Sequence, residues 1–442
     1  MAIARYKTIA DELADRIGKG ALKPGDRLPS VRALMQIHGL ALATAARVYN
    51  ELEAVGLVVG ECGRGTFVRD LTLPRAVGMV HRSAGAGVLD LTFSYPTLPG
   101  QDAMLRDGLR SIAAQGDLDA LLHSAPPGGR PHERQMIARH LRNRGIRVQG
   151  EQVLIVSGAS QGLAIAAMAL LKPGDLLAVD ALTYPGMLAL AHAQRLDVKA
   201  LPLTAGGTDL DALEKLCKRH PVRAVYSMPT MHNPLGFVMS ESDRSRLGTL
   251  ARRYDFLIIE DAAYAFLAEP APRPIQAHAP DRTVYVSSMS KSISAGLRVG
   301  FVVAPPALVS VLEQAVRTST WQASSVPVAL TCHWIESGLV DALEDRKRSD
   351  ARSRQRVARR VLSDCTVVAH HSSYYLWIGL PQGERADRVA ADLAQQGVLV
   401  MTAKSFAATP HAPQALRVAL GALPLEALHK ALHSIKAALN SA

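Results

Sequence analysis

One stretch, from Val284 to Phe301, places a single lysine inside a frame suited to phosphate binding. The apolar residues at its start predict a short buried strand, and the Ser-rich turn after them leads through Gly296 to a second apolar run. Ser288 and Arg298 could face one anion, because Arg offers a planar fork of donors and Ser a short hydroxyl. Lys291 beside a phosphate site indicates a Schiff-base cofactor, although an ordinary lysine on a basic surface loop fits the same residues.

The pattern S-x-S-K followed by G-L-R-x-G resembles the cofactor-lysine segment of fold-type I aminotransferases, particularly their kynurenine-aminotransferase-like branch. These are the pyridoxal-phosphate enzymes of the aspartate aminotransferase type. The resemblance implies that Lys291 forms the Schiff base with pyridoxal 5'-phosphate and that Ser288 and Arg298 hold its phosphate. Ala295 departs from the pattern, because that family usually has proline before the glycine, and a less rigid loop is expected here.

Length and composition set the bounds of the fold. A chain of 442 residues is long enough for two or three domains. Apolar residues make up 48% and charged residues 20%, which excludes disordered and fibrous classes. The formal charge of +11 favours a polyanionic partner, though Arg-rich enzymes also carry such a charge. The four cysteines are far apart and form no CxxC pair, so we expect reduced thiols, no metal site and no disulfide framework.

No segment has the pattern of a membrane or export signal. The first twenty residues lack the apolar core of a secretory signal. The most apolar window, Val153–Leu171, is interrupted by serine, glycine and glutamine, which is typical of a strand, a turn and a helix rather than a membrane span. A soluble cytoplasmic protein is therefore expected.

Residues 1–70 have the pattern of a small DNA-binding domain. Apolar residues recur at helical spacing over Ile9–Ile17, Val31–Ile37 and Leu42–Val55. Two strands follow, Leu57–Val59 and Thr66–Val68, joined by a turn rich in glycine. Three helices and a hairpin predict a winged helix-turn-helix. The alternative is a small helical packing domain with solvated arginines, and the hairpin glycines argue against it.

The segments PGDRLPSVRAL, TAARVYNELEAVGLV and GRGTFV, in this order and spacing, closely resemble the DNA-binding domain of the GntR family of bacterial regulators. The resemblance implies that the third helix enters a major groove and that the wing tip lies near the minor groove. Ala41 and Leu42 stand where the family commonly has a Ser-Arg pair, so affinity is expected to depend more on the wing. The resemblance places these residues at the DNA: Arg32, Thr44, Arg47, Arg64 and Gly65.

Residues 71–88 have no sustained period and contain Pro74 and several small residues, so they predict a linker. Eighteen extended residues reach at most roughly 60 Å, so the N-terminal DNA-binding domain must stay near its own large domain or near an adjacent partner. From residue 89 to 442, strand and helix patterns alternate, which predicts an α/β domain with a mainly parallel sheet. A smaller C-terminal α+β subdomain is expected from about residue 325.

Two motifs of this large domain add to the expected cofactor site. VLIVSGASQGL predicts a strand that leads into a helix N-terminus, where free N–H groups bind phosphate, though small residues at such a corner usually serve packing. It resembles the G-S-Q-Q phosphate turn of the aminotransferases at Gly158, with Ala159 replacing the serine and Ser160 a glutamine. In DALTYPG, Tyr184 follows a strand, where an aromatic is more often core. The resemblance implies that Tyr184 stacks on the pyridine ring.

Three further motifs follow the same resemblance. AVYSMPTMHNPLGF is similar to T-P-x-x-Q-N-P-T-G, which assigns the ring-hydroxyl asparagine to Asn233. His232 stands where glutamine is usual; its role is open, and a loop histidine is more often solvated. FLIIEDAAYAF predicts a buried strand that ends in carboxylates, which are ordinarily salt-bridge partners. In the family, the residues matching Asp261 and Tyr264 bind the pyridine nitrogen and the ring oxygen. PQALRVALGA resembles the segment whose arginine clamps the substrate carboxylate, here Arg417.

Two more features bear on DNA binding and on catalysis. The basic run Arg346–Arg360 predicts a solvated helix face, with extra contacts to DNA phosphates as the alternative. Ser124 takes the place of the tyrosine that, in the resembled family, reaches the cofactor phosphate of the neighbouring subunit. Efficient transamination is therefore less expected.

Together the two halves resemble the MocR subfamily of transcriptional regulators over essentially the whole chain. The resemblance implies a homodimer whose DNA binding is biased by the cofactor or by an amino-acid-like effector, and target genes of vitamin B6, amino-acid or amine metabolism. Two alternatives stay open. One is a working aminotransferase with an accessory arm, and the other is a regulator whose cofactor site is vestigial.

Overall fold

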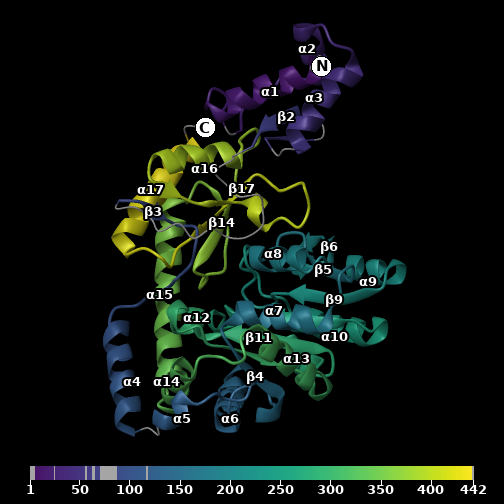
Figure 1. Ribbon diagram of the computed structural model, residues 1–442. Coiled ribbons are helices and arrows are strands. Elements are labelled where there is room, and N and C mark those ends of the chain that lie inside the picture. The colour runs from purple at the N-terminus through teal and green to yellow at the C-terminus, as the bar shows by residue number, and fades with distance from the viewer. Residues whose placement is uncertain are drawn as a thin grey trace.

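The computed structural model describes residues 5–23, 25–54, 57–61, 65–69, 87–115 and 118–440. Three parts follow one another from top to bottom in Figure 1: an N-terminal domain, a subdomain that holds the C-terminal end of the chain, and a large domain around a central sheet. The predicted linker, residues 71–88, lies outside the described residues except for its last two.

The N-terminal domain has the predicted three helices and hairpin. Ser30 caps the second helix, because its Oγ accepts a hydrogen bond from the N–H of Ala33 at 3.1 Å, and Gly39 ends that helix in the left-handed conformation. The helices bury one apolar cluster that includes Leu34, Val48 and Leu52. The elements are α1 (Arg5–Gly18), α2 (Val31–His38), α3 (Leu42–Ala54) and the antiparallel strands β1 (Val58–Glu61) and β2 (Gly65–Val68).

The large domain is built on a seven-stranded sheet in the order β4-β12-β11-β10-β9-β5-β6. Only β12 runs antiparallel to its neighbours, so the prediction of a mainly parallel α/β sheet is confirmed. Parallel strands bring their carboxyl ends to one edge, which is where ligands bind in such sheets. The strands are β4 (Val153–Val156), β5 (Leu176–Asp180), β6 (Asp197–Leu201), β9 (Val222–Ser227), β10 (Leu257–Asp261), β11 (Thr283–Ser288) and β12 (Gly300–Val303).

Helices cover both faces of this sheet. On one face α7 and α13 pack over Leu154, Val286 and Val302, and on the other α6 and α14 pack over Ile155 and Phe301. The helices are α4 (Gln101–Gln115), α5 (Leu118–Leu122), α6 (Pro131–His140), α7 (Ala159–Leu170), α8 (Pro185–Ala193), α9 (Leu210–Arg219), α10 (Glu241–Tyr254), α11 (Ile275–His278), α12 (Met289–Ser292), α13 (Pro306–Ser319) and α14 (Ser325–Glu336). Shorter pieces are η1 (Leu141–Arg144), η2 (Gly150–Gln152), η3 (Ala265–Leu267), η4 (Ala295–Leu297), and the hairpin β7 (Leu203–Thr204) and β8 (Gly207–Thr208).

The C-terminal subdomain is an antiparallel sheet in the order β13-β14-β17-β16, backed by helices. A pair of short parallel strands, β3 and β15, joins it to the segment that follows the linker. Its elements are β3 (Leu89–Asp90), α15 (Leu339–Val361), β13 (Thr366–Val368), β14 (Tyr375–Gly379), α16 (Ala386–Gln395), β15 (Val398–Leu399), β16 (Met401–Thr402), η5 (Ala403–Phe406), β17 (Ala415–Ala419) and α17 (Leu425–Asn440).

The long helix α15 runs from the large domain into the subdomain (Figure 1). The prediction that its basic run is a solvated face is wrong for Lys347, Arg348 and Arg354, which are buried. These three side chains face neighbouring segments and donate to backbone carbonyls there; Arg354, for example, donates to the carbonyl oxygens of Leu420 and Leu423. Helical periodicity sets which residues share a face, but the packing of other elements decides which face is covered: Lys347 is buried, whereas its neighbour Arg346 is exposed.

None of the helices in the described part of the chain is long and apolar enough to cross a membrane.

Candidate functional site

The carboxyl ends of β9, β10 and β11 open onto a cavity of about 150 Å³ beside the subdomain. Nearly all the residues that the sequence predicted for the cofactor and its effector line this one cavity. They are Ala159, Ser160, Tyr184, Asn233, Asp261, Tyr264, Ser288, Lys291, Arg298 and Arg417. Gly158 lies directly behind them, because a Cβ at this position would lie 2.5 Å from Nη2 of Arg298.

Lys291 lies on the short helix α12 rather than in a turn, since Ser288 caps that helix. Its Nζ donates a hydrogen bond to the carbonyl oxygen of Ser94 at 2.6 Å and lies 4.8 Å from the ring centroid of Tyr95. Burial and, to a smaller extent, the positive charges of Arg417 and Arg298 lower the pKa of Lys291 to about 7, against the opposing effect of Asp261. Near neutral pH the amine therefore has a substantial neutral fraction, which is the nucleophilic form.

One end of the cavity is built for an anion. The guanidinium of Arg298 donates to the carbonyl oxygen of Ser157 at 2.9 Å and to Oγ of Ser290 at 3.3 Å. Gly158 has φ of +91° and precedes the first turn of α7, whose free N–H groups point towards this end. Gly300 lets two backbones meet, because a Cβ there would lie 2.6 Å from the carbonyl carbon of Gly158. This arrangement of N–H groups, hydroxyls and a guanidinium suits a phosphate.

The cavity is also lined by a buried carboxylate. Asp261 accepts hydrogen bonds from the hydroxyl of Tyr226 at 2.8 Å and from the N–H of Ala263 at 3.0 Å. Burial raises the pKa of Asp261, while these two hydrogen bonds and the charge of Lys291 lower it. Burial also raises the pKa of Tyr264 to about 12, which keeps this phenol protonated and able to donate. A carboxylate and a phenol in one cavity can pair with a protonated ring nitrogen and a ring oxygen.

Asn233 is buried, and its Oδ1 has no hydrogen-bond partner among the described residues. The neighbouring His232 is also buried, which contradicts the expectation of a solvated loop histidine. The His232 ring stacks on Phe237 with centroids 4.1 Å apart, and its Nε2 lies 3.4 Å from Oδ2 of Asp180. His232 therefore packs beneath the loop that carries Asn233, because the tertiary fold closes that loop against the ends of the strands.

Arg417 is a buried cation that forms no ion pair with a carboxylate among the described residues. Its side chain is 4% exposed, and Nε and Nη1 have no hydrogen-bond partner within the described part of the chain. Nη2 has only a weak acceptor, the sulfur of Met401 at 3.6 Å, and the guanidinium carbon lies 5.3 Å from the ring centroid of Phe406. A buried guanidinium that lacks an acceptor is costly, so this site is complementary to an anionic group of a ligand.

These polar groups fit pyridoxal 5'-phosphate. The Arg298 end matches a phosphate, and Asp261, Tyr264 and the unpaired oxygen of Asn233 match the polar atoms of a substituted pyridine ring. The amine of Lys291 belongs to the same cavity. When bound, this cofactor supplies an aldehyde carbon that accepts amines and a ring that withdraws electrons.

Sequence reasoning missed three residues of the site. Ser94 and Tyr95 contact Lys291, and Tyr226 donates to Asp261. The segment FSYPTLPG has no regular period, and its only signal is two aromatic residues before a Pro-Gly turn. Tyr226 lies inside an apolar strand, where a tyrosine is indistinguishable from a core residue by pattern alone.

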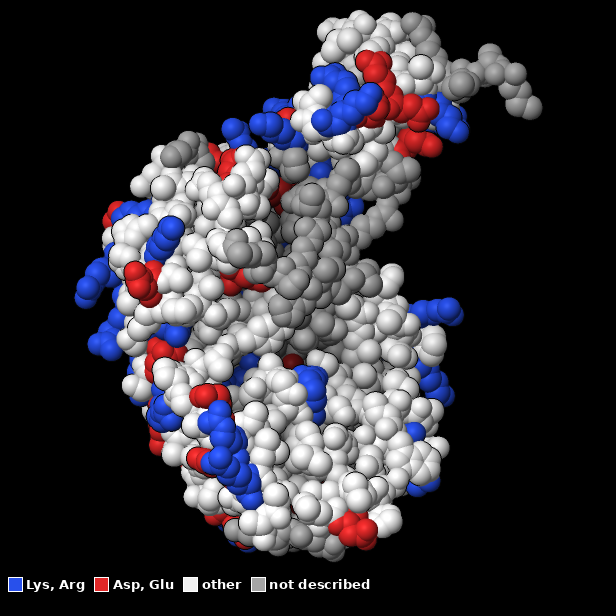
Figure 2. Space-filling model, turned by 60° about the vertical axis from the view of Figure 1, so that its left-hand side comes forward, with Lys and Arg blue, Asp and Glu red and all other residues white. Residues whose placement is uncertain are grey.

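The predicted DNA contacts lie on the described surface of the N-terminal domain, apart from Arg64, which falls outside the described residues. Arg32 and Arg47 are exposed, and the Arg47 guanidinium lies 4.6 Å from the ring centroid of Tyr6. Thr44 is half-buried on the same helix as Arg47. Basic side chains gather on this domain, with acidic ones beside them, in the upper part of Figure 2.

Gly65 lies where the wing strand β2 begins, with φ of +120°. A Cβ there would lie 2.9 Å from Nε of Arg27, so glycine lets the wing pack against that side chain. Ser124 is exposed and follows α5, as the sequence placed it, ahead of α6.

Known protein families match both the N-terminal domain and the rest of the chain. The profile of the family "Aminotransferase class I and II" matches residues 87–435, and that of "Bacterial regulatory proteins, gntR family" matches residues 5–68. The chain is 28% identical to the HTH-type transcriptional regulator YjiR of Escherichia coli K12, over 98% of each chain. It is also 28% identical to the HTH-type transcriptional regulator TauR of Rhodobacter capsulatus, over 89% of this chain and 88% of that one.

The fold of the large domain and subdomain is that of solved aminotransferases. The kynurenine aminotransferase of Pyrococcus horikoshii superposes with a TM-score of 0.75 at 22% identity, covering 80% of this chain and 91% of that one. An archaeal alanine:glyoxylate aminotransferase gives the same TM-score at 20% identity, over 81% of this chain and 92% of that one. The chain thus belongs to the aminotransferase class I and II family, which depends on pyridoxal 5'-phosphate, and with its GntR-type domain it has the architecture of the MocR transcriptional regulators.

Proposed function

We propose that this DNA-binding regulator senses pyridoxal phosphate, an amino acid or an amine at the Lys291 cavity, and so controls genes of vitamin B6, amino-acid or amine metabolism. Binding of promoter DNA implies a cytoplasmic location in a bacterium. Ligand binding changes DNA affinity if the two ligands favour different arrangements of the domains. Rapid transamination is not part of this proposal.

The observation that carries the proposal is the guanidinium of Arg417, whose Nε and Nη1 have no hydrogen-bond partner among the described residues, in the same cavity as Lys291. A carboxylate can accept two parallel hydrogen bonds from a guanidinium, which satisfies the N–H groups that lack partners. An α-amino acid places its amine a few bonds from that carboxylate, where it can compete with Lys291 for the cofactor. This pairing of an amine site with a carboxylate clamp favours amino acids over simple amines.

Displacement of Lys291 would change charge and packing at one point of the structure. Its amine now donates to the Ser94 carbonyl and faces the Tyr95 ring, so release from the cofactor frees a side chain that contacts the segment after β3. β3 pairs with β15 of the subdomain that contacts the N-terminal domain. A local switch of this kind can bias an interface between domains.

The test is DNA affinity as a function of ligand. Fluorescence anisotropy on DNA from the region flanking the gene gives Kd values without ligand, with pyridoxal phosphate, and with each of a panel of α-amino acids. Amines that lack the carboxylate serve as matched ligands. We expect a coupling of about 1–3 kcal/mol, roughly 5- to 150-fold in Kd. Arg417→Met should lose the preference for amino acids over amines and keep the response to the cofactor alone.

Lys291→Ala separates cofactor binding from the sensing step. Wild-type protein should be yellow with pyridoxal phosphate, and Lys291→Ala should lack that visible band, because no other lysine lines the cavity in the described part of the chain. An unchanged Kd for DNA under all ligands, together with brisk keto-acid formation, would refute the sensing role.

A homodimer is the second part of the proposal. Large apolar side chains are exposed on α4, on α5, at the start of α14 and at Trp321 just before it, and α14 packs against both α4 and α5. Leu122 is 83% exposed and Trp321 51% exposed, and exposed patches of this kind commonly mark protein interfaces. Light scattering should give twice the chain mass, and Leu122→Glu with Trp321→Glu should shift the mass towards one chain.

An active aminotransferase is the alternative, and one observation favours it. Asp261, Tyr264, Lys291 and Arg298 all line the cavity, so the groups expected for catalysis are retained. Multiple turnovers with an amino acid and a 2-oxo acid, at the same protein concentration as the DNA titration, would support the enzyme. Ser124 in place of the family tyrosine supports the regulator.

A further inference from the structure

A second lysine lies behind the first. Lys347 is on α15, and its side chain is fully buried with 0% exposure. Its Nζ donates three hydrogen bonds to backbone carbonyl oxygens: to Pro96 at 2.9 Å, to Lys291 at 3.0 Å and to Ile293 at 2.7 Å. The side chain therefore reaches the backbone of the cofactor lysine itself.

The three acceptors belong to the two segments that enclose the Lys291 side chain. Pro96 follows directly after Ser94 and Tyr95, which contact the Lys291 amine. Ile293 ends α12, and its carbonyl oxygen also accepts from Nε2 of Gln101 at 2.8 Å. The ammonium group of Lys347 thus links α12 to the segment that contains Pro96.

The number of acceptors bears on the charge of Lys347. Burial and, to a smaller extent, the charge of Lys291 lower the pKa of Lys347 to about 7, against the opposing effect of Asp350 and Glu344. Three carbonyl acceptors nevertheless need three N–H donors, and only the ammonium form has three. A neutral amine would direct its lone pair at a carbonyl oxygen. The hydrogen bonds therefore favour the charged form.

Among the described residues, this charge has no direct counter-ion. Within the described residues no carboxylate oxygen forms an ion pair with Lys347, although the carboxyl group of Asp350 lies one turn along α15 and accepts from Tyr374 and Arg354. The charge therefore acts on its surroundings more strongly than an ion-paired one would. The groups that face Lys291 from the other elements around it are Arg298, Arg417, Asp261, Tyr95 and Tyr264.

We propose that Lys347 is a positioning residue for Lys291: its ammonium group holds the backbone on both sides of the Lys291 side chain and places a fixed positive charge behind it. This inference rests on the proposed role of Lys291 as the lysine that binds the cofactor. The positive charge disfavours a second proton nearby, so the nitrogen of Lys291 loses its proton more readily while Lys347 is present.

The test compares Lys347→Met and Lys347→Gln with wild-type holoprotein. Methionine has a similar length without donors or charge, and glutamine keeps two N–H donors without the charge. The readout is the pH midpoint of the visible absorption of bound pyridoxal phosphate, followed by spectrophotometry. Both variants should raise that midpoint by roughly one pH unit, because each removes the charge. Lys347→Met should also release the cofactor faster than Lys347→Gln, because it removes all three hydrogen bonds.

Arg346→Met is the matched control. Arg346 is the adjacent cation on α15 and donates to the carbonyl oxygen of Pro99 at 3.0 Å, but it is exposed, so the midpoint should stay at the wild-type value. A midpoint that is equal in wild type, Lys347→Met and Lys347→Gln would overturn the proposal, even if both variants melt at lower temperature. If neither variant folds, ¹⁵N NMR of wild-type protein with labelled lysine decides, because a neutral amine at Lys347 near pH 7 contradicts the fixed charge and an ammonium group supports it.

The same measurements separate this inference from the proposed function. A wild-type protein that never develops a visible band with pyridoxal phosphate would contradict the role of Lys291. A visible band whose midpoint does not respond to the Lys347 substitutions would contradict the role of Lys347 alone.

Discussion

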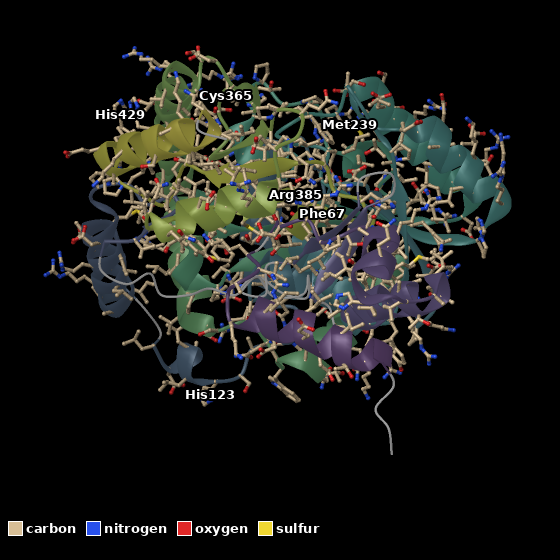
Figure 3. The ribbon with its side chains drawn as sticks, turned by 90° about the horizontal axis from the view of Figure 1, so that it is seen from above. Phe67, His123, Met239, Cys365, Arg385 and His429 are labelled. Atoms are coloured by element: carbon tan, nitrogen blue, oxygen red, sulfur yellow. The ribbon has the colours of Figure 1, made fainter. Side chains whose placement is uncertain are left out.

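The guanidinium carbon of Arg385 lies 3.9 Å from the centroid of the Phe67 ring. Figure 3 shows the two side chains together where the N-terminal domain meets the subdomain. Phe67 belongs to the wing strand β2, and Arg385 directly precedes α16. Close by, Gly25 packs on the same helix, since a Cβ at Gly25 would lie 3.1 Å from Cβ of Arg388. The wing of the DNA-binding domain thus rests on the subdomain whose strand β17 carries Arg417.

Arg385→Ala tests whether this contact transmits the ligand signal. A cation–π contact contributes about 0.5–2 kcal/mol, so its loss should weaken the coupling between ligand and DNA several-fold. The Kd for DNA without ligand and the visible band of the cofactor should both stay near wild type. Arg385→Lys keeps a cation over the Phe67 ring and should retain most of the response. An equal response to ligand in Arg385→Ala and wild type would exclude this route.

Gly158→Ala should weaken cofactor binding by displacing Arg298. The new Cβ would lie 2.5 Å from Nη2 of Arg298, and the residue has φ of +91°. Gly174→Ala is the matched control, because Gly174 has φ of +87° but nothing within 4 Å of its Cβ. Both variants carry similar backbone strain, so the difference between their Kd values for pyridoxal phosphate reports the steric clash between the new Cβ and Arg298 alone. We expect a higher Kd for pyridoxal phosphate only in Gly158→Ala, measured by absorbance titration, and equal values would contradict the anion-binding role of this corner.

We expect the ionisation of Glu260 to make the free energy of unfolding depend on pH. Its pKa is raised from 4.5 to about 7 because burial outweighs the opposing effects of Arg244 and of the N–H groups of Gln276 and Ile275. Between these two pH values the folded state binds more protons than the unfolded state, so the free energy of unfolding falls as the pH rises. Glu260→Gln removes this dependence. Relative to wild type, its free energy of unfolding should rise by up to about 3 kcal/mol between pH 4.5 and 7.

Urea unfolding of both proteins at several pH values gives this difference directly. Glutamine loses one of the two hydrogen bonds that Glu260 accepts from Ile275 and Gln276, which adds a constant offset but no slope. A difference that does not change with pH would show that Glu260 stays ionised in the folded state throughout this range.

Arg47→Ala and Arg64→Ala should weaken DNA binding and leave the cofactor band unchanged, because the substitutions are on the other domain from Lys291. Loss of a base contact should cost about 1–3 kcal/mol, and loss of a phosphate contact should reduce the dependence of Kd on salt. Arg16→Ala, on the exposed side of α1, is the control within the same domain. Wild-type Kd and salt dependence in both wing and helix variants would contradict the placement of this domain on DNA.

The sequence by itself determined the two domain types and most of the cavity. Ser288, Lys291 and Arg298 lie within eleven residues, and Asp261 and Tyr264 within four, so each group is held by one strand end and the turn or helix after it. Such local units keep their geometry in any fold that buries the strand. Hydrophobic periodicity likewise predicted the helices of the N-terminal domain, because their apolar faces recur at helical spacing.

Only the tertiary structure decided which polar residues are buried and what they touch. His232 and three basic residues of α15, Lys347, Arg348 and Arg354, have the sequence pattern of solvated positions, yet the packing of other elements encloses them. Lys347 contacts Pro96 and Lys291 across 251 and 56 positions of the chain. Arg385 contacts Phe67, which belongs to a different domain. No spacing in the sequence encodes such pairs, because burial of a charged group depends on the surfaces that distant segments bring to it.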